Sequence, residues 1–210
     1  MDKIQQMFNI DEGGIWMILI LLMSFICLGL IIERCICIFI IYNMNGKNFM
    51  SQIQKCVMSD SIDRALKLCN SQQRSALSRV IKAGLTKANG SELEVQNALE
   101  EASLEVVPDI MKRLPMLASM ANLATLLGLL GTIIGLIDAF ESLESAAPDK
   151  RQEMLSRGIA LAMNTTAFGL IVAIPSLIFH ALLSATSTKI IGDIELYSMK
   201  LGNMLASRTK

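Results

Sequence analysis

The chain has 210 residues, of which 52% are hydrophobic and 18% are charged, and its formal net charge is zero. This balance excludes a disordered tail, which would carry more charge, and a nucleic-acid-binding protein, which would be basic. The apolar residues are gathered into long runs, and this pattern differs from that of an ordinary soluble domain.

Three of these runs are long enough to cross a bilayer, which takes about 20 apolar residues. The first is interrupted by Glu33 and Arg34. It is too long for a removable signal peptide, and only Lys3 precedes it. We predict a polar lead at 1–13 and transmembrane helices at 14–42, 116–140 and 158–183.

Lysine and arginine predict the orientation, because cytoplasmic loops carry an excess of both. The lead holds one such residue, the segment 43–115 holds ten, the loop 141–157 holds three and the tail 184–210 holds four. We therefore expect the segment 43–115 and the tail to be cytoplasmic. The N-terminus and the loop are expected outside.

The segment 43–115 is predicted to be helical throughout. Apolar residues recur at a spacing of about 3.6 over 62–69 and 77–85. The segment has no strand pattern and no glycine-rich phosphate loop, so we expect helices that pack on neighbours in an oligomer. A further helix is expected in the tail 184–210.

One cytoplasmic helix has a clear start signal. Asn-Gly at 89–90 breaks the pattern, and Ser91 with Glu94 three residues later forms a capping box. We expect the helix to continue into the second membrane span, although Pro108 or Pro115 could kink or segment it.

The second and third runs each carry a stripe of small and hydroxyl residues on one helical face. Such stripes allow membrane helices to approach closely, and Gly131 with Gly135 forms a GxxxG pair. Two matched stripes also favour a polar lining shared between helices. Both interpretations hold if the glycines form the contact and the threonines line an ion path. The stripes are Ala121, Thr125, Gly128, Thr132, Gly135 and Ala139, and Gly158, Ala162, Thr166, Gly169, Ala173, Ser176 and His180.

Acidic groups are almost absent from the apolar runs. The third run has none, and the second has only Asp138 near its outer end. Glu33 and Arg34 are adjacent, so we expect them on different sides of the first helix, where they would hold subunits in register. Pro175 leaves the Ile171 carbonyl without its usual helical partner. The chain therefore offers hydroxyls but no deep carboxylate, and a proton path would need an acid from another chain.

Nothing in the sequence indicates an enzyme, a cofactor or a metal site. There is no nucleophile–base pair, and the single histidine, His180, is remote from the cysteines. No CxxC motif occurs, so we expect reduced, buried thiols rather than metal ligands or disulfides. The cysteines are Cys27, Cys35, Cys37, Cys56 and Cys69.

The stretch LeuLeuGlyLeuLeuGlyThrIleIleGlyLeuIleAspAlaPhe, residues 126–140, resembles the ExbB/TolQ/MotA family of ion-driven motor (stator) subunits. GlyIleAlaLeuAlaMetAsnThrThrAlaPheGlyLeuIleValAlaIlePro, residues 158–175, is similar to the family's other signature, and 63–69 is a weaker match. The likeness is closest to the ExbB/TolQ branch. It implies an all-α protein of the bacterial inner membrane with three transmembrane helices, a periplasmic N-terminus and a cytoplasmic C-terminus.

The resemblance also implies an assembly. A homo-pentamer in the lipid would hold, in its pore, two copies of an ExbD/TolR/MotB-like single-span subunit, which supplies a membrane aspartate. The family's pore-lining threonines correspond to Thr132 and Thr166, with Thr165 adjacent. Leu161 stands where ExbB and TolQ usually carry a glutamate, which leaves proton and sodium both open. The small residues expected to pack helices and line the pore are Gly128, Gly131, Gly135, Gly169 and Pro175.

The leading hypothesis is a pore-forming subunit that couples ion flow to mechanical work through its partner. The alternative is a non-conducting membrane scaffold of the same fold, which Leu161 and the acid-free spans favour. Import, envelope maintenance and gliding all remain open as the process it powers. The short cytoplasmic region argues against flagellar rotation.

Overall fold

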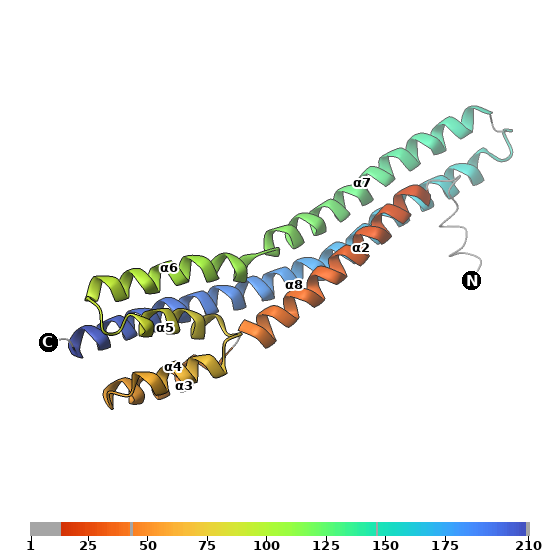
Figure 1. Ribbon diagram of the computed structural model, residues 1–210. Helices are drawn as coiled ribbons and strands as arrows, with labels where there is room; N and C mark the ends of the chain where they lie inside the picture. Colours follow the sequence, from red (N-terminus) through yellow and green to blue (C-terminus); the bar gives the residue numbers. More distant parts are fainter. Residues whose placement is uncertain (1–13, 43, 146, 209–210) are drawn as a thin grey trace. The chain divides into compact units, whose positions relative to one another are not determined.

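The computed structural model describes residues 14–42, 44–145 and 147–208, so the predicted lead at 1–13 lies outside the described residues. Within these ranges every regular element is a helix, which confirms the all-α prediction (Figure 1). The described chain forms two compact units. Among the described residues, one comes from 14–32 and 113–181, and the other from 33–112 and 182–208.

The first unit contains long apolar helices. These are α2 (Gly14–Cys35), α7 (Leu114–Ser145) and the first part of α8 (Arg151–Arg208). Three helices of the described chain are long and apolar enough to cross a membrane, as the three apolar runs predicted. Their outer faces carry large apolar side chains such as Phe25, which is 68% exposed. Apolar side chains on the outside suit a lipid environment.

The helices extend beyond the apolar runs that predict them. The α7 helix continues to Ser145 and α8 begins at Arg151, so most of the expected loop at 141–157 is helical. The first run ends in a different geometry, because a π-helix, η2 (Ile36–Tyr42), follows α2. Short π-helical segments are rare and are often found at functional sites.

The second unit is built from four shorter helices and the last part of α8. The helices are α3 (Gly46–Met58), α4 (Ile62–Ser71), α5 (Ala76–Thr86) and α6 (Glu92–Met111). The segments 62–69 and 77–85 therefore form helices, as their spacing predicted. Each places its apolar face in a common core, whose fully buried large side chains include Ile53, Val80, Ile81, Ile194 and Leu201.

The start of α6 forms as its sequence predicts. The Ser91 hydroxyl accepts a hydrogen bond from the Glu94 amide, and the Glu94 carboxylate accepts one from the Ser91 amide. These two bonds satisfy amide donors that a helix start otherwise leaves without partners. Pro108 lies inside α6 without ending it.

The predicted long helix is segmented before the second span, which was one of the two outcomes expected of the prolines. The α6 helix ends at Met111, and α7 begins at Leu114. Between them Arg113 adopts φ 65°, a left-handed conformation that stops a helix. Pro115 then falls in the first turn of α7, where its missing amide proton would have no partner within the helix. This proline therefore marks a helix start rather than a kink.

All five cysteines are free thiols, and Cys27 and Cys69 are buried. In the second unit, burial raises the pKa of Cys69 from its ordinary value of 9.0 to about 11. The Ser78 hydroxyl donates a hydrogen bond of 2.9 Å to the Cys69 carbonyl and links α5 to α4. Cys69 therefore stays protonated and acts as a small apolar residue.

Candidate ion-pathway site

The small residues of α7 and α8 bring two backbones into direct contact. A Cβ added to Gly169 would lie 2.7 Å from the Ala124 carbonyl oxygen, closer than real Cβ atoms approach. A Cβ added to Gly128 would lie 3.1 Å from the Thr165 carbonyl and 3.3 Å from the Gly169 Cα. Because the obstructing atoms belong to the backbone, a side chain here would force the helices apart.

The contact continues along the same faces. A Cβ at Gly131 would meet the Thr165 side chain at 3.0 Å and the Trp16 Cβ of α2 at 3.2 Å. A Cβ at Gly135 would lie 3.2 Å from the Ala162 Cβ. The predicted stripes therefore face each other, and their glycines form the helix–helix contact in the first unit.

Three threonine hydroxyls meet at this contact. The Thr132 and Thr166 hydroxyls are hydrogen-bonded to each other across the two helices. Thr166 also donates to the Gly128 carbonyl at 3.0 Å, and Thr132 lies 3.1 Å from the carbonyls of Gly128 and Ala162. Thr165 donates to the Ala162 carbonyl at 2.7 Å. Hydroxyl and carbonyl oxygen atoms are therefore gathered at one level along two apolar helices.

Access differs among the three hydroxyls. The Thr165 side chain is buried, whereas Thr132 and Thr166 are only half-buried. A hydroxyl has one proton to donate and two lone pairs to accept with, so Thr132 and Thr166 can exchange partners without losing every bond. Hydroxyl and carbonyl oxygens can ligate a hard cation, and the hydroxyls can also orient a carboxylate. The structure brings the Thr132 and Thr166 hydroxyls together, and the buried Thr165 lies beside them.

No acid lies beside the cluster in the part of the chain that the structure describes. Asp138 is exposed near the C-terminal end of α7, and the half-buried Leu161 precedes the Ala162 of the contact. Among the described residues no group of His, Cys, Asp and Glu could hold a metal ion.

Pro175 leaves α8 continuous, and the helix runs through it to Arg208. One residue later the buried Ser176 donates a hydrogen bond of 2.8 Å to the Val172 carbonyl. The Val172 carbonyl follows the Ile171 carbonyl, which lacks its usual helical donor because Pro175 has no amide proton. Pro175 and Gly169 thus shape one helix, but only Gly169 lies against α7 at the hydroxyl cluster.

The Glu33 and Arg34 side chains differ in exposure, at 36% and 5%, but their charged ends meet. The Arg34 guanidinium pairs with the Glu33 carboxylate at 3.2 Å and donates to the Asp109 carbonyl at 3.4 Å. Adjacent residues can meet because their long side chains fold back along the helix surface. Arg34 is buried, and in the second unit it ties the end of the first apolar run to α6.

The threonine-bearing helices lie in a recognisable stretch of sequence. Residues 72–196 match the sequence model of the MotA/TolQ/ExbB proton channel family, and this match covers more than half of the chain. The chain belongs to this family. A search of curated proteins found no match.

Membership of the MotA/TolQ/ExbB family confirms the predicted resemblance at the level of the family, whose description includes all three branches. The family is one of proton channels rather than enzymes. Three helices apolar enough to span a membrane agree with this membership. The direct bond between Thr132 and Thr166 was not predicted, although the two matched stripes placed both residues on facing sides.

Proposed function

We propose that this chain is the pore-lining subunit of an ion-driven membrane motor, in which proton flow performs mechanical work through a single-span partner. The observation that supports the proposal is the Thr132–Thr166 hydroxyl pair, half-buried between two apolar helices of a proton channel family member. Hydroxyls at membrane depth can exchange hydrogen bonds with a moving proton carrier without bearing a charge themselves.

In this proposal the carrier is an aspartate on an ExbD/TolR/MotB-like partner, two copies of which occupy the pore of a homo-pentamer. Each partner carboxylate would take a proton, pass a threonine pair and release the proton on the other side. One hydroxyl of the pair would keep donating to the Gly128 carbonyl and would use a free lone pair to accept a hydrogen bond from the protonated carboxyl group. The driving energy is about 2.3 kcal/mol per charge for each 100 mV of membrane potential.

The proposed location is the bacterial cytoplasmic membrane, with the N-terminus in the periplasm and residues 43–115 and 184–210 in the cytoplasm. The distribution of basic residues supports this orientation. Because Leu161 stands where the ExbB/TolQ branch usually carries a glutamate, the partner would have to supply the only acid of this path. Sodium is the second candidate ion, since its ligands would be the same hydroxyl and carbonyl oxygens.

The test is ion flux in liposomes that contain the chain and a partner encoded beside it. Thr166→Val and Thr132→Val each remove a hydroxyl at nearly constant volume. A hydrogen bond to a charged group contributes about 1.5–3 kcal/mol, so we expect flux to fall roughly tenfold to a hundredfold. The mass of the purified complex should be unchanged.

Thr125→Val is the matched control, because Thr125 lies two turns away on the same face of α7 and bonds only its own helix, at the Ala121 carbonyl. It should keep full flux. Equal flux in all three variants and the unaltered protein would contradict the proposed path.

A non-conducting scaffold of the same fold is the second candidate. It is supported by the fact that the hydroxyls already satisfy one another and nearby carbonyls within one chain. If the scaffold is correct, vesicles with both subunits will show no more flux than vesicles with the partner alone, while the complex still assembles.

A further inference from the structure

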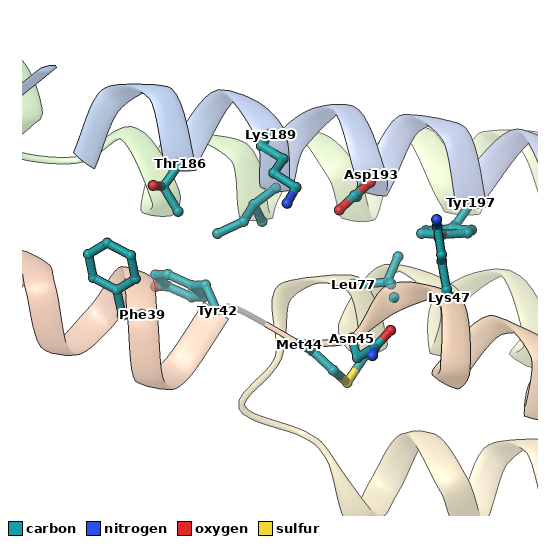
Figure 2. A pocket seen from close by; sticks show the side chains of 12 residues that line it. Phe39, Tyr42, Met44, Asn45, Lys47, Leu77, Thr186, Lys189, Asp193 and Tyr197 are labelled. Carbon is teal, nitrogen blue, oxygen red and sulfur yellow. The ribbon is translucent and has the colours of Figure 1, made fainter. Parts of the chain in front are cut away.

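The second unit contains a cavity that the proposed motor mechanism does not use. Its volume is about 650 Å³, and it lies among η2, the start of α3, α5 and the last part of α8. Figure 2 shows Phe39 and Tyr42 of η2 opposite Thr186 and Lys189 of α8. This volume falls within the range of small-ligand sites, about 300–1,000 Å³.

The cavity has a positive balance of charge. Lys47 and Lys189 line it, and Asp193 is the only acid in its lining. Neither lysine forms an ion pair with a carboxylate of the described residues. Two ammonium groups facing one carboxylate leave room for one negative charge from a ligand, and the Tyr42 hydroxyl offers a further donor.

Packing leaves the backbone little freedom at the start of α3. Gly46 lies against the Tyr197 ring, where an added Cβ would come within 2.6 Å of a ring carbon. The Asn45 side chain caps α3 by accepting a hydrogen bond from the Asn48 amide. The backbone that carries Lys47 is thus fixed beside α8, and the amide end of α3 adds a partial positive charge.

The position of the cavity along the sequence places it at the edge of a membrane. Tyr42 ends the first apolar run, and Thr186 follows the end of the third run by three residues. Tyrosine and lysine are the residues that anchor membrane proteins at the lipid–water boundary. On one side the wall is apolar, with Phe39 (49% exposed) and Ile190, and the neighbouring Ile40 is 74% exposed.

We propose that this cavity binds the phosphate headgroup of an anionic phospholipid, with Lys47 and Lys189 contacting the phosphate and Phe39 contacting an acyl chain. Basic pockets between membrane helices on the cytoplasmic side are suited to anionic headgroups, which are concentrated in that leaflet. The wall that is charged on one side and apolar on the other favours a lipid over a free phosphate ion. This site depends on membrane insertion and not on ion conduction.

The test titrates the full-length chain, purified in detergent with its partner, with short-chain phosphatidylglycerol, and native mass spectrometry counts the bound lipids. Lys47→Gln and Lys189→Gln should each weaken phosphatidylglycerol binding about fivefold, and the double variant roughly twenty-five-fold. Lys55→Gln with Lys67→Gln is the matched control, because both lysines are exposed and lie outside the cavity. It should bind as the unaltered protein does.

Asp193→Asn tests the site in the opposite direction, since it removes the one acid from the lining. We expect tighter phosphatidylglycerol binding, which a merely unfolded variant would not give. Phosphatidylcholine should bind more weakly than phosphatidylglycerol, and inorganic phosphate at equal concentration should not displace the lipid. Displacement by phosphate alone would overturn the lipid assignment. Equal phosphatidylglycerol binding by the cavity variants and the control variant would overturn the site itself.

Discussion

At the scale of single residues, the glycines of α2, α7 and α8 differ sharply in what surrounds them. Gly169 and Gly128 face backbone atoms of the opposing helix, whereas nothing lies within 4 Å of the Cβ position at Gly29 or Gly192. A backbone neighbour cannot rotate away as a flexible side chain can. Glycine is therefore required by packing at the hydroxyl cluster and is replaceable at the open positions.

Gly169→Ala should destabilise the protein by about 1–3 kcal/mol, because the added methyl group overpacks a closed contact. The melting temperature of the detergent-purified complex measures the effect. Gly29→Ala is the control in an apolar helix of the same unit, and it should leave the melting temperature unchanged or raise it. A lower melting temperature for Gly29→Ala than for Gly169→Ala would contradict the assigned contact.

Residue identity predicted which faces of α7 and α8 carry the small residues, because helical periodicity fixes that face. It did not predict the partner of each hydroxyl, since the register of two helices depends on their packing. The ion pair between Glu33 and Arg34 was missed for a related reason. Helical geometry positions the Cβ atoms, but the ends of long side chains reach in directions that the backbone does not determine.

At the scale of elements, helix ends were predictable where the signal is local. The start of α6 follows from Ser91 and Glu94, because both hydrogen bonds of the capping box lie within four residues. The break between α6 and α7 had a weaker signal, because Pro115 indicated only that the helix could kink or segment there. Arg113 has a positive φ, which arginine seldom adopts. A glycine or asparagine at this position would have predicted the left-handed conformation, but an arginine does not.

Ser91→Ala should remove one half of the capping box and cost about 1 kcal/mol. Hydrogen exchange of the amides in the first turn of α6 should become faster, and the Glu94 amide should show the largest change because it loses its acceptor.

The matched control is Ser75→Ala at the start of α5, where the side chain makes no capping bond and its hydroxyl is buried without a partner among the described residues. This change should leave stability equal or slightly higher, because an unpaired polar group in the interior is unfavourable. Equal losses at Ser75 and Ser91 would show that the box contributes nothing specific.

At the scale of the whole molecule, one chain leaves much apolar surface uncovered. Large side chains on all three apolar helices are more than half exposed, among them Leu22, Leu126 and Ile171. Lipid or neighbouring subunits must cover such surfaces. Hydropathy predicted the membrane helices because the bilayer imposes their length and composition on each chain separately. The predicted arrangement of several chains around a pore depends on which surfaces of neighbouring chains contact each other, and hydropathy does not predict those contacts.

Orientation is the remaining property of the whole chain that its sequence predicts and labelling can measure. Ten basic residues in the segment 43–115 against three in the loop 141–157 predict that the segment is cytoplasmic. Two single-cysteine variants report on the two sides: one keeps only Cys56, which is half-buried in α3, and the other carries Asp149→Cys at an exposed position. A membrane-impermeant maleimide should label the second variant in cells with a permeabilised outer membrane, and the first only in inverted vesicles. The reverse pattern would invert the topology and would move the proposed headgroup site to the outer leaflet.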